Sequence, residues 1–542
     1  MKKFALLIFI ISLAFFLRFY QLANNPPSLN WDEVSHGYNA YSILKTGNDE
    51  WGIKFPLIFR AYGDYKLPLY IYLTVPFIWA LGRNLLAIRM VSVLSGVGLV
   101  FVAYLITKKI TQKEIPSLFA AFLTAVSPWS LFLSRVAVEA NLGAFLFSLG
   151  IYFFICWLEH QKVKNLFFTF LFWGLSVYSY NSARILVPIL TVVTLFLILK
   201  KRLLKKSISA IVFLTLLLTP FIFQFIDSSG KARFNLVSLI DQGAVNQISE
   251  RRTSSKIPSP FKELAFNRVT FFFVSAFKNY FTNLSPGYLF FRGGSQYQFS
   301  LPDHELLYLV TAPFLLIGIL VLIFKKRQKG KFILAWFFLA LIPSAITKDA
   351  PHVLRTILIL PSPMILSALG LSWLIDKIGS QSRFKGKFIL AILVIAVLIS
   401  FGKWWIDYQK IYPKAYSWAW QYGYREVVAF VKDKYTDYDQ IYFTKRLGEP
   451  HEFIAFYWPW DPEVFYQEKK WDYHSDWYWV NSLGKFAFVN DWEMKNITCS
   501  SFGTRCLMVT SPGNYPDGWS KIKTINLLDD KPVFEILEKV NQ

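Results

Sequence analysis

The sequence predicts a polytopic α-helical membrane protein with a small α/β domain at its C-terminal end. The mean hydropathy is +0.36 and 54% of the residues are hydrophobic, which is typical of a chain that crosses a membrane many times. Eleven apolar runs occupy about half of residues 1–402, and many approach the roughly 20 residues that a spanning helix needs. Residues 403–542 carry shorter helical and strand-like patterns instead.

The first apolar run follows the basic start "MKK" and lacks a small-residue cleavage site. It therefore predicts a retained first helix, with the N-terminus in the cytoplasm, and not a removed signal peptide. We expect spans at 4–20, 87–107, 115–133, 142–158, 166–182, 185–199, 207–226, 306–324, 332–347, 353–375 and 388–402.

The positive charge supports this topology. The chain has 58 Lys and Arg against 35 Asp and Glu, and the basic residues gather in short loops at every second connection. Cytoplasmic loops carry this bias in membrane proteins, so we interpret the charge as topological and expect no nucleic-acid partner. The basic loops are 107–113, 159–164, 200–206, 325–331 and 376–387, which places the loops 21–86 and 227–305 and the tail 403–542 outside the cytoplasm.

One apolar segment, 67–82, is short and contains Pro68 and Pro76, and a crossing there would reverse every later loop. We expect an interfacial or re-entrant helix. In the tail, "YREVVAFVKDKY" has helical spacing, whereas "QIYFTKR", "KFAFVN" and "RCLMVTS" are strand-like, so residues 403–542 predict an external α/β domain.

Three cysteines exclude a disulfide framework and show no metal-binding spacing. Cys156 lies in an apolar run. A bridge between Cys499 and Cys506 is left open, and a location outside the cell would permit it.

The stretch "SLNWDEVSHGYNAYSILKTG" places two adjacent acids just after the first span. Asn30 and Glu33 have the spacing of an N-cap and its capping-box partner, which is a structural explanation for Glu33. Asp32, His36 and Asn39 share one face of the predicted helix. A cap does not require a second acid, so Asp32 is a candidate functional residue near the membrane surface.

Several cations lie at a similar depth: Lys66, Arg83, Arg89 and Arg135, the last followed by Glu139. Snorkelling explains any one of these cations, and an Arg-to-Glu pair four residues apart is a weak helix pair. Their number on the external side, against the charge bias of the loops, favours a site for an anion.

The segments "NWDE", "DYKLPLYIYLTVPFIWALGRNLLAIRMVSVLSG" and "SPWSLFLSRVAVEANLG" resemble membrane glycosyltransferases with the GT-C fold. The resemblance is to bacterial protein O-mannosyltransferase-like enzymes and to lipid A aminoarabinose transferases. Here "KLPL" stands where those families have Lys-Pro-Pro-Leu, and "RMVS" where they have Arg-Leu-Pro-Ser. The resemblance covers roughly residues 1–200, and residues 271–294 resemble an external loop of uncharacterised bacterial members.

The resemblance implies inverting transfer of a sugar from a polyprenyl-phosphate carrier to an acceptor hydroxyl on a glycan, lipid or protein at the external face of the plasma membrane. It implies Asp32 as general base, and leaves Glu33, His36 and Glu139 for acceptor positioning or a divalent ion. No cofactor is required, and metal dependence stays open. The donor phosphate would contact Lys66, Arg135, Arg89 and Arg292. Arg292 and His304 would join the donor site together, and a structural role is the favoured alternative for these two.

A transporter or flippase of a lipid-linked or anionic substrate is the alternative. Transporters have paired broken helices and polar residues at the midplane, whereas the charges here lie mostly toward one face. A scaffold without catalysis is a third class, and the joint presence of Asp32, Lys66 and Arg135 argues against it.

The topology gives a direct prediction. In a background without native cysteines, Cys at positions 205 and 328 should be shielded from an impermeant thiol reagent in intact cells, whereas Cys at 470 should react, because the charge pattern places only 470 outside. Labelling of the variant at 205 in intact cells would contradict the arrangement of spans.

Overall fold

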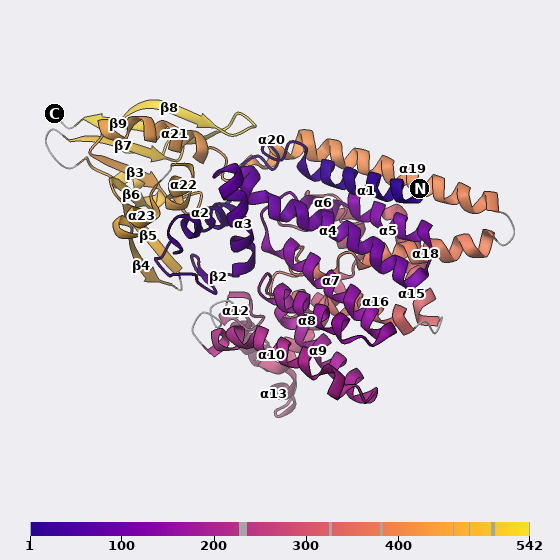
Figure 1. Ribbon diagram of the computed structural model, residues 1–542. Coiled ribbons are helices and arrows are strands. Elements are labelled where there is room, and N and C mark those ends of the chain that lie inside the picture. Colours follow the sequence, from indigo (N-terminus) through magenta and orange to yellow (C-terminus); the bar gives the residue numbers. More distant parts are fainter. Residues whose placement is uncertain are drawn as a thin grey trace. The chain divides into compact units, whose positions relative to one another are not determined.

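The computed structural model describes residues 2–226, 236–324, 328–379, 383–458, 460–475, 477–499 and 504–540 (Figure 1). The chain forms two compact units. One contains residues 1–20, 92–134 and 139–404, and the other contains residues 21–91, 135–138 and 405–542. The last segment of the second unit begins close to the predicted boundary at 402. This unit also takes in most of the first predicted external loop, which the sequence had assigned to the membrane domain.

The second unit is built on a mixed seven-stranded sheet in the order β4-β5-β6-β3-β7-β9-β8. Strand β3 is parallel to β6 and β7, and the other neighbours are antiparallel. The elements of this unit are α2 (Trp31–Thr46), β1 (Phe59–Arg60), β2 (Tyr65–Lys66), α3 (Pro68–Leu81), η4 (Asp407–Ile411), α20 (Tyr412–Tyr416), η5 (Ser417–Trp420), α21 (Tyr424–Lys434), η6 (Tyr435–Asp437), β3 (Gln440–Thr444), α22 (Pro450–Tyr457), α23 (Pro462–Glu468), β4 (Lys470–His474), β5 (Trp477–Leu483), β6 (Phe486–Val489), η7 (Asp491–Asn496), β7 (Arg505–Thr510), β8 (Ser520–Asn526) and β9 (Pro532–Val540).

The predicted sheet domain is confirmed, and its helix and three strands lie where the tail patterns placed them. Alternation along β9 sends Phe534 toward α21, where the Tyr424 ring stacks on Phe453 and Phe443. Leu537 points to the opposite face of the sheet.

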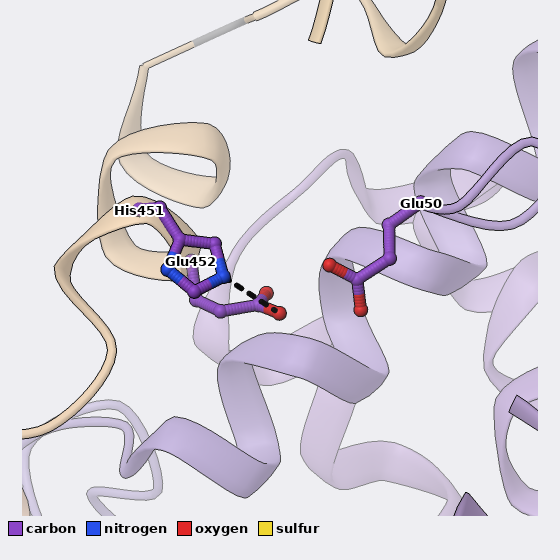
Figure 2. A group of neighbouring side chains, drawn as sticks. All are labelled: Glu50, His451 and Glu452. Atoms are coloured by element: carbon purple, nitrogen blue, oxygen red, sulfur yellow. Dashed lines mark ion pairs between the residues drawn. The ribbon is translucent and has the colours of Figure 1, made fainter. Parts of the chain in front are cut away.

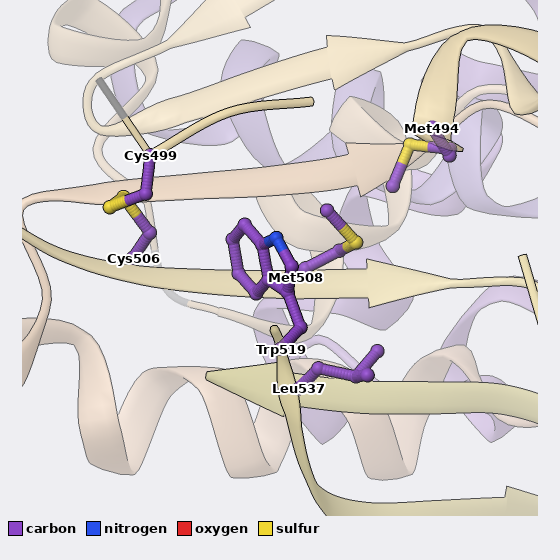
Figure 3. Close-up of a cluster of buried hydrophobic side chains, with 6 residues drawn as sticks. All are labelled: Met494, Cys499, Cys506, Met508, Trp519 and Leu537. Atoms are coloured by element: carbon purple, nitrogen blue, oxygen red, sulfur yellow. A yellow bond between two sulfur atoms is a disulfide. The ribbon is translucent and has the colours of Figure 1, made fainter. Parts of the chain in front are cut away.

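That opposite face carries a second hydrophobic cluster, shown in Figure 3. It contains the Cys499–Cys506 disulfide, so the bridge that the sequence left open is present. Burial of these side chains fixes the short η7 and the segment before β7 on the sheet. The cluster consists of Met494, Cys499, Cys506, Met508, Trp519 and Leu537.

The named elements of the first unit are all helices in the part that the structure describes, joined by loops (Figure 1). Its helices are α1 (Lys2–Phe19), α4 (Leu85–Thr111, whose first residues belong to the second unit), α5 (Glu114–Val126), α6 (Pro128–Leu133), α7 (Glu139–His160), α8 (Val163–Val177), α9 (Ala183–Lys200), α10 (Leu204–Ile226), α12 (Gln242–Ser254), α13 (Phe261–Ala265), α14 (Arg268–Asn283), η1 (Gly287–Arg292), η2 (Leu309–Thr311), α15 (Ala312–Phe324), α16 (Gln328–Leu339), α17 (Ile342–Ala345), η3 (Ile357–Ile359), α18 (Ser362–Gly379) and α19 (Arg383–Ile406).

Six helical segments among the described residues are long and apolar enough to cross a membrane. Several other predicted spans coincide with apolar helices of 10–17 residues. The class of polytopic helical membrane protein is therefore confirmed, whereas the number of eleven crossings stays a prediction. The six segments are Leu85–Thr111, Glu139–His160, Ala183–Lys200, Leu204–Phe221, Ile357–Ile378 and Phe384–Trp420.

Helices α15 and α18 cross with their backbones in direct contact, which two glycines allow. A Cβ atom at Gly318 would collide with the carbonyl oxygen of Leu366, and one at Gly370 would collide with that of Phe314. Within a membrane the hydrophobic effect does not drive helices together, so helix pairs rely on close packing, which small residues at the contact allow.

We therefore expect Gly318→Ala and Gly370→Ala to destabilise the protein by about 1–3 kcal/mol, the usual cost of overpacking, because the new methyl group meets rigid backbone. Thermal unfolding of the full chain in nanodiscs measures this. Gly402→Ala in α19 is the matched control, since no heavy atom lies within 4 Å of the added Cβ. Equal melting temperatures for wild type and Gly318→Ala would show that the crossing is not tight.

Candidate functional site

The candidate site starts at the N-terminus of α2. The side chain of Asn30 accepts a hydrogen bond from the backbone N–H of Glu33 at 2.9 Å, and the backbone N–H of Asn30 donates to Glu33 Oε2 at 3.3 Å. The predicted capping box is thus confirmed. The helix ends at Gly47, whose φ of 76° closes the last turn.

Glu33 has a second role that the cap did not predict. Its carboxylate forms a two-point ion pair with Arg89, with Nε to Oε1 at 2.9 Å and Nη2 to Oε2 at 3.0 Å. Both side chains are fully buried. Glu33 Oε1 also accepts the backbone N–H of Ala137 at 2.8 Å. The pair joins α2, the first turns of α4 and the segment 135–138.

The remaining N–H groups of Arg89 donate to backbone carbonyls. Nη1 contacts the oxygens of Leu22 and Pro26 at 2.9 and 3.1 Å, and Nη2 contacts that of Ser28 at 2.6 Å. With the two bonds to Glu33, all five guanidinium N–H groups have protein acceptors. Arg89 is therefore fully engaged within the protein in this structure, and its predicted contact with the donor phosphate stays a prediction.

Asp32 lies in a different environment from its neighbour. Its carboxylate forms an ion pair with the ammonium group of Lys66, and the two side chains are 34% and 13% exposed. Lys66 is presented by the short hairpin of β1 and β2, in which Phe59 pairs with Lys66. The structure therefore brings together the predicted base and one predicted phosphate ligand, and leaves their ion pair partly accessible.

His36 and Arg135 are buried in the same unit. His36 Nδ1 lies 3.2 Å from the carbonyl oxygen of Ala137. Arg135 donates from Nε to the Tyr408 hydroxyl at 3.1 Å and from Nη2 to the Asn25 carbonyl at 2.8 Å, and its side chain is fully buried. Both side chains are buried, at 0% exposure, and their predicted roles at the site stay predictions.

Three predicted residues belong to the other compact unit. Glu139 is the first residue of α7, Arg292 is the exposed last residue of η1, and His304 lies in a loop with Nδ1 2.8 Å from the Pro302 carbonyl. Their predicted roles stay predictions.

Sequence reasoning missed a buried polar cluster in the second unit, shown in Figure 2. Glu50, His451 and Glu452 each offer a metal-ligating atom, and these atoms lie within 4.8 Å of one another. The ammonium of Lys469 lies 3.7 Å from Glu50 Oε2 and donates to the Glu50 carbonyl at 3.0 Å. The only sequence signal was the run "EPHEF", which resembles no metal motif.

Burial controls the electrostatics of this cluster. Burial raises the pKa of Glu452 well above its ordinary value, and the nearby Glu50 carboxylate raises it further. Burial also raises the pKa of Glu449 to about 7 and the pKa of Asp49 to about 6. The same burial lowers the pKa of His451 and of Lys469. Charged forms are therefore costly at this place unless an opposite charge accompanies them.

Comparisons with known proteins agree with the fold. Residues 66–224 match the family model described as dolichyl-phosphate-mannose-protein mannosyltransferase. The structure is similar to that of ArnT from Cupriavidus metallidurans bound to undecaprenyl phosphate, with a TM-score of 0.58 and 12% identity over 98% of this chain and 97% of that chain. No curated protein sequence matches the chain.

A second similar structure is the archaeal oligosaccharyltransferase AglB from Archaeoglobus fulgidus, in complex with an inhibitory peptide and a dolichol-phosphate. The TM-score is 0.51 and the identity 14%, over 84% of this chain and 63% of that chain. ArnT and AglB are GT-C proteins, so the predicted resemblance to the GT-C fold is confirmed.

The buried pair gives a stability prediction. Glu33→Gln should destabilise the protein by about 3–5 kcal/mol, because it leaves the Arg89 charge buried without its counter-ion. Asp32→Asn, the adjacent isosteric change at a partly exposed ion pair, should cost no more than about 1 kcal/mol. Thermal unfolding of both variants in nanodiscs measures the difference. Similar losses for the two variants would mean that Glu33 does not hold the scaffold.

Proposed function

We propose that this chain is an inverting glycosyltransferase that moves a sugar from a polyprenyl-phosphate carrier to an acceptor hydroxyl at the external face of the membrane. The matched family model describes transfer from dolichyl phosphate mannose, and the ArnT and AglB structures were determined with polyprenyl phosphates. A lipid carrier can present a sugar on the side of the membrane where no nucleotide sugar is available. The topology predicted from the loop charges places the Asp32 unit on that side.

The observation that carries the proposal is the contrast between the two adjacent acids. The Glu33 side chain is buried and its carboxylate is fully engaged, whereas the Asp32 side chain is 34% exposed beside Lys66. A carboxylate that must take a proton from an acceptor has to be reachable by that acceptor. Of the pair, only Asp32 meets this requirement.

The step needs one base because the leaving group is already a stable anion. The acceptor oxygen attacks C1 of the sugar, its proton passes to the Asp32 carboxylate, and the C1–O bond to the phosphate breaks with its electron pair on the phosphate oxygen. Two carboxylates are needed in glycosidases because an alcohol leaves poorly. The Lys66 ammonium stabilises the charge that develops on the departing phosphate.

The ion pair between Asp32 and Lys66 also implies an order of binding. While Lys66 holds Asp32, its ammonium occupies the carboxylate that the acceptor hydroxyl has to reach. A donor phosphate that competes for Lys66 would release the carboxylate toward the acceptor. Donor binding would therefore activate the base.

The transporter alternative is not favoured, because the family match and both similar structures are glycosyltransferases. Glu33 and Arg89 act in this proposal as positioning residues that hold the first turn of α2. The identity of the sugar and that of the acceptor depend on groups beyond these residues.

Asp32→Asn should lower turnover by about 10²–10⁴, the usual contribution of a positioned base, with little change in melting temperature. The assay follows release of polyprenyl phosphate from polyprenyl-phosphate sugars by purified protein supplied with an envelope extract, and mass spectrometry of the products identifies the acceptor. Lys66→Met should instead raise the donor concentration that gives half-maximal rate. Near-normal transfer by Asp32→Asn, with the melting temperature unchanged, would remove the base from the proposal.

A further inference from the structure

We propose that Glu50, His451 and Glu452 form a binding site for one zinc-class divalent cation. The site is separate from Asp32 and Lys66, and it does not depend on the proposed transfer reaction. All three side chains are nearly fully buried, at 1%, 2% and 1% exposure. Figure 2 shows the Glu50 carboxylate facing Glu452 and His451.

The spacing of the ligand atoms fits a metal. One atom from each residue lies within 4.8 Å of the others, and His451 Nε2 is 3.8 Å from Glu452 Oε1. In a tetrahedral zinc site, bonds of about 2.0–2.2 Å place ligand atoms about 3.4 Å apart, so small side-chain rotations suffice. One imidazole with two carboxylates favours zinc over magnesium or calcium, which prefer oxygen ligands alone.

Two carboxylate oxygens of the cluster are buried without a hydrogen bond. Oε2 of Glu50 and Oε2 of Glu452 have no hydrogen-bond partner among the described residues, although the Lys469 ammonium lies at ion-pair distance from Glu50 Oε2, 3.7 Å away. Buried polar oxygens without partners are costly, so their presence at one place calls for a ligand that the protein itself does not supply.

Further side chains orient the ligands from outside. Asn39 donates to Glu50 Oε1 at 2.9 Å, and the backbone N–H of Glu50 donates to Asn39 Oδ1 at 3.1 Å. Oε2 of Glu449 lies 3.6 Å from His451 Nδ1, which is too long for a hydrogen bond, and Nδ1 has no hydrogen-bond partner among the described residues. A small approach of the two groups would give His451 the carboxylate partner that metal-binding histidines usually have, with Nε2 left available as the ligand.

The charge of the cluster points the same way. Four buried carboxyl groups, those of Asp49, Glu50, Glu449 and Glu452, outnumber the buried ammonium of Lys469, which contacts the Glu50 carbonyl and the Trp51 ring and lies 3.7 Å from Glu50 Oε2. A divalent cation would neutralise the excess. The competing explanation is a proton shared between Glu50 and Glu452.

The site would connect two distant parts of the chain within one unit. Glu50 lies in the loop after α2, the helix that carries Asp32, and the other two ligands lie in the first turn of α22. The cation would therefore hold α2 on the sheet domain.

The test uses full-length protein in nanodiscs, stripped with a chelator and then dialysed against buffered zinc. We expect one zinc per chain by elemental analysis and a melting temperature that rises with zinc concentration. His451→Gln and Glu452→Gln should lose the bound zinc. Glu449→Gln should weaken zinc affinity by about 10- to 100-fold, as loss of an outer partner does. Asp49→Asn is the matched control, buried next to Glu50 but outside the ligand set, and should keep the zinc.

Two results would overturn the proposal. The first is that wild-type protein retains no stoichiometric zinc and gains no stability from added zinc, while Glu452→Gln is as stable as wild type in chelator. That combination is expected if Glu50 and Glu452 share a proton. The other is retention of zinc by both His451→Gln and Glu452→Gln, which would place the metal elsewhere. These readouts do not involve sugar transfer, so failure of the transfer assay leaves them unaffected.

Discussion

The buried ion pair between Glu33 and Arg89 is the constraint on which the candidate site depends. Two charges removed from water are tolerated only when their mutual geometry is good and every remaining donor is used. Here the guanidinium is saturated by the carboxylate and by the carbonyls of the loop 22–28, and the carboxylate also takes a backbone N–H from the segment 135–138. Three stretches of chain, the loop 22–28, the start of α4 and the segment 135–138, are thereby fixed around the first turn of α2.

That anchor determines what the neighbouring acid can do. Successive residues of a helix point about 100° apart, so fixing Glu33 inward turns Asp32 away from the buried pair. The β1–β2 hairpin then brings Lys66 to it. Two acids adjacent in the sequence thus have different environments, one saturated and structural, the other partly accessible and paired with a cation that an anionic donor can compete for. We infer that the scaffold and the chemistry are divided between these two residues.

Local features of this arrangement could be predicted from the sequence, and distant pairings could not. The capping box follows from the three-residue spacing of Asn30 and Glu33, and the tail strands follow from their alternation. The contacts of Arg89 could not be predicted. The local sequence around a single arginine near a predicted membrane surface is the same whether the side chain binds lipid, phosphate or a buried acid. Glu50 and His451 lie in different parts of the chain, and only the fold brings them together. The order of the sheet strands is non-local for the same reason.

The central claim is that the donor phosphate binds at Lys66 and frees Asp32. A structure of the protein with bound undecaprenyl phosphate in a nanodisc tests it most directly, since it shows both groups at once. The account predicts phosphate oxygens within hydrogen-bond distance of the Lys66 ammonium and an Asp32 carboxylate no longer paired with it, while the Glu33–Arg89 pair is unchanged. A phosphate bound away from Lys66, with the Asp32–Lys66 ion pair intact, would contradict it.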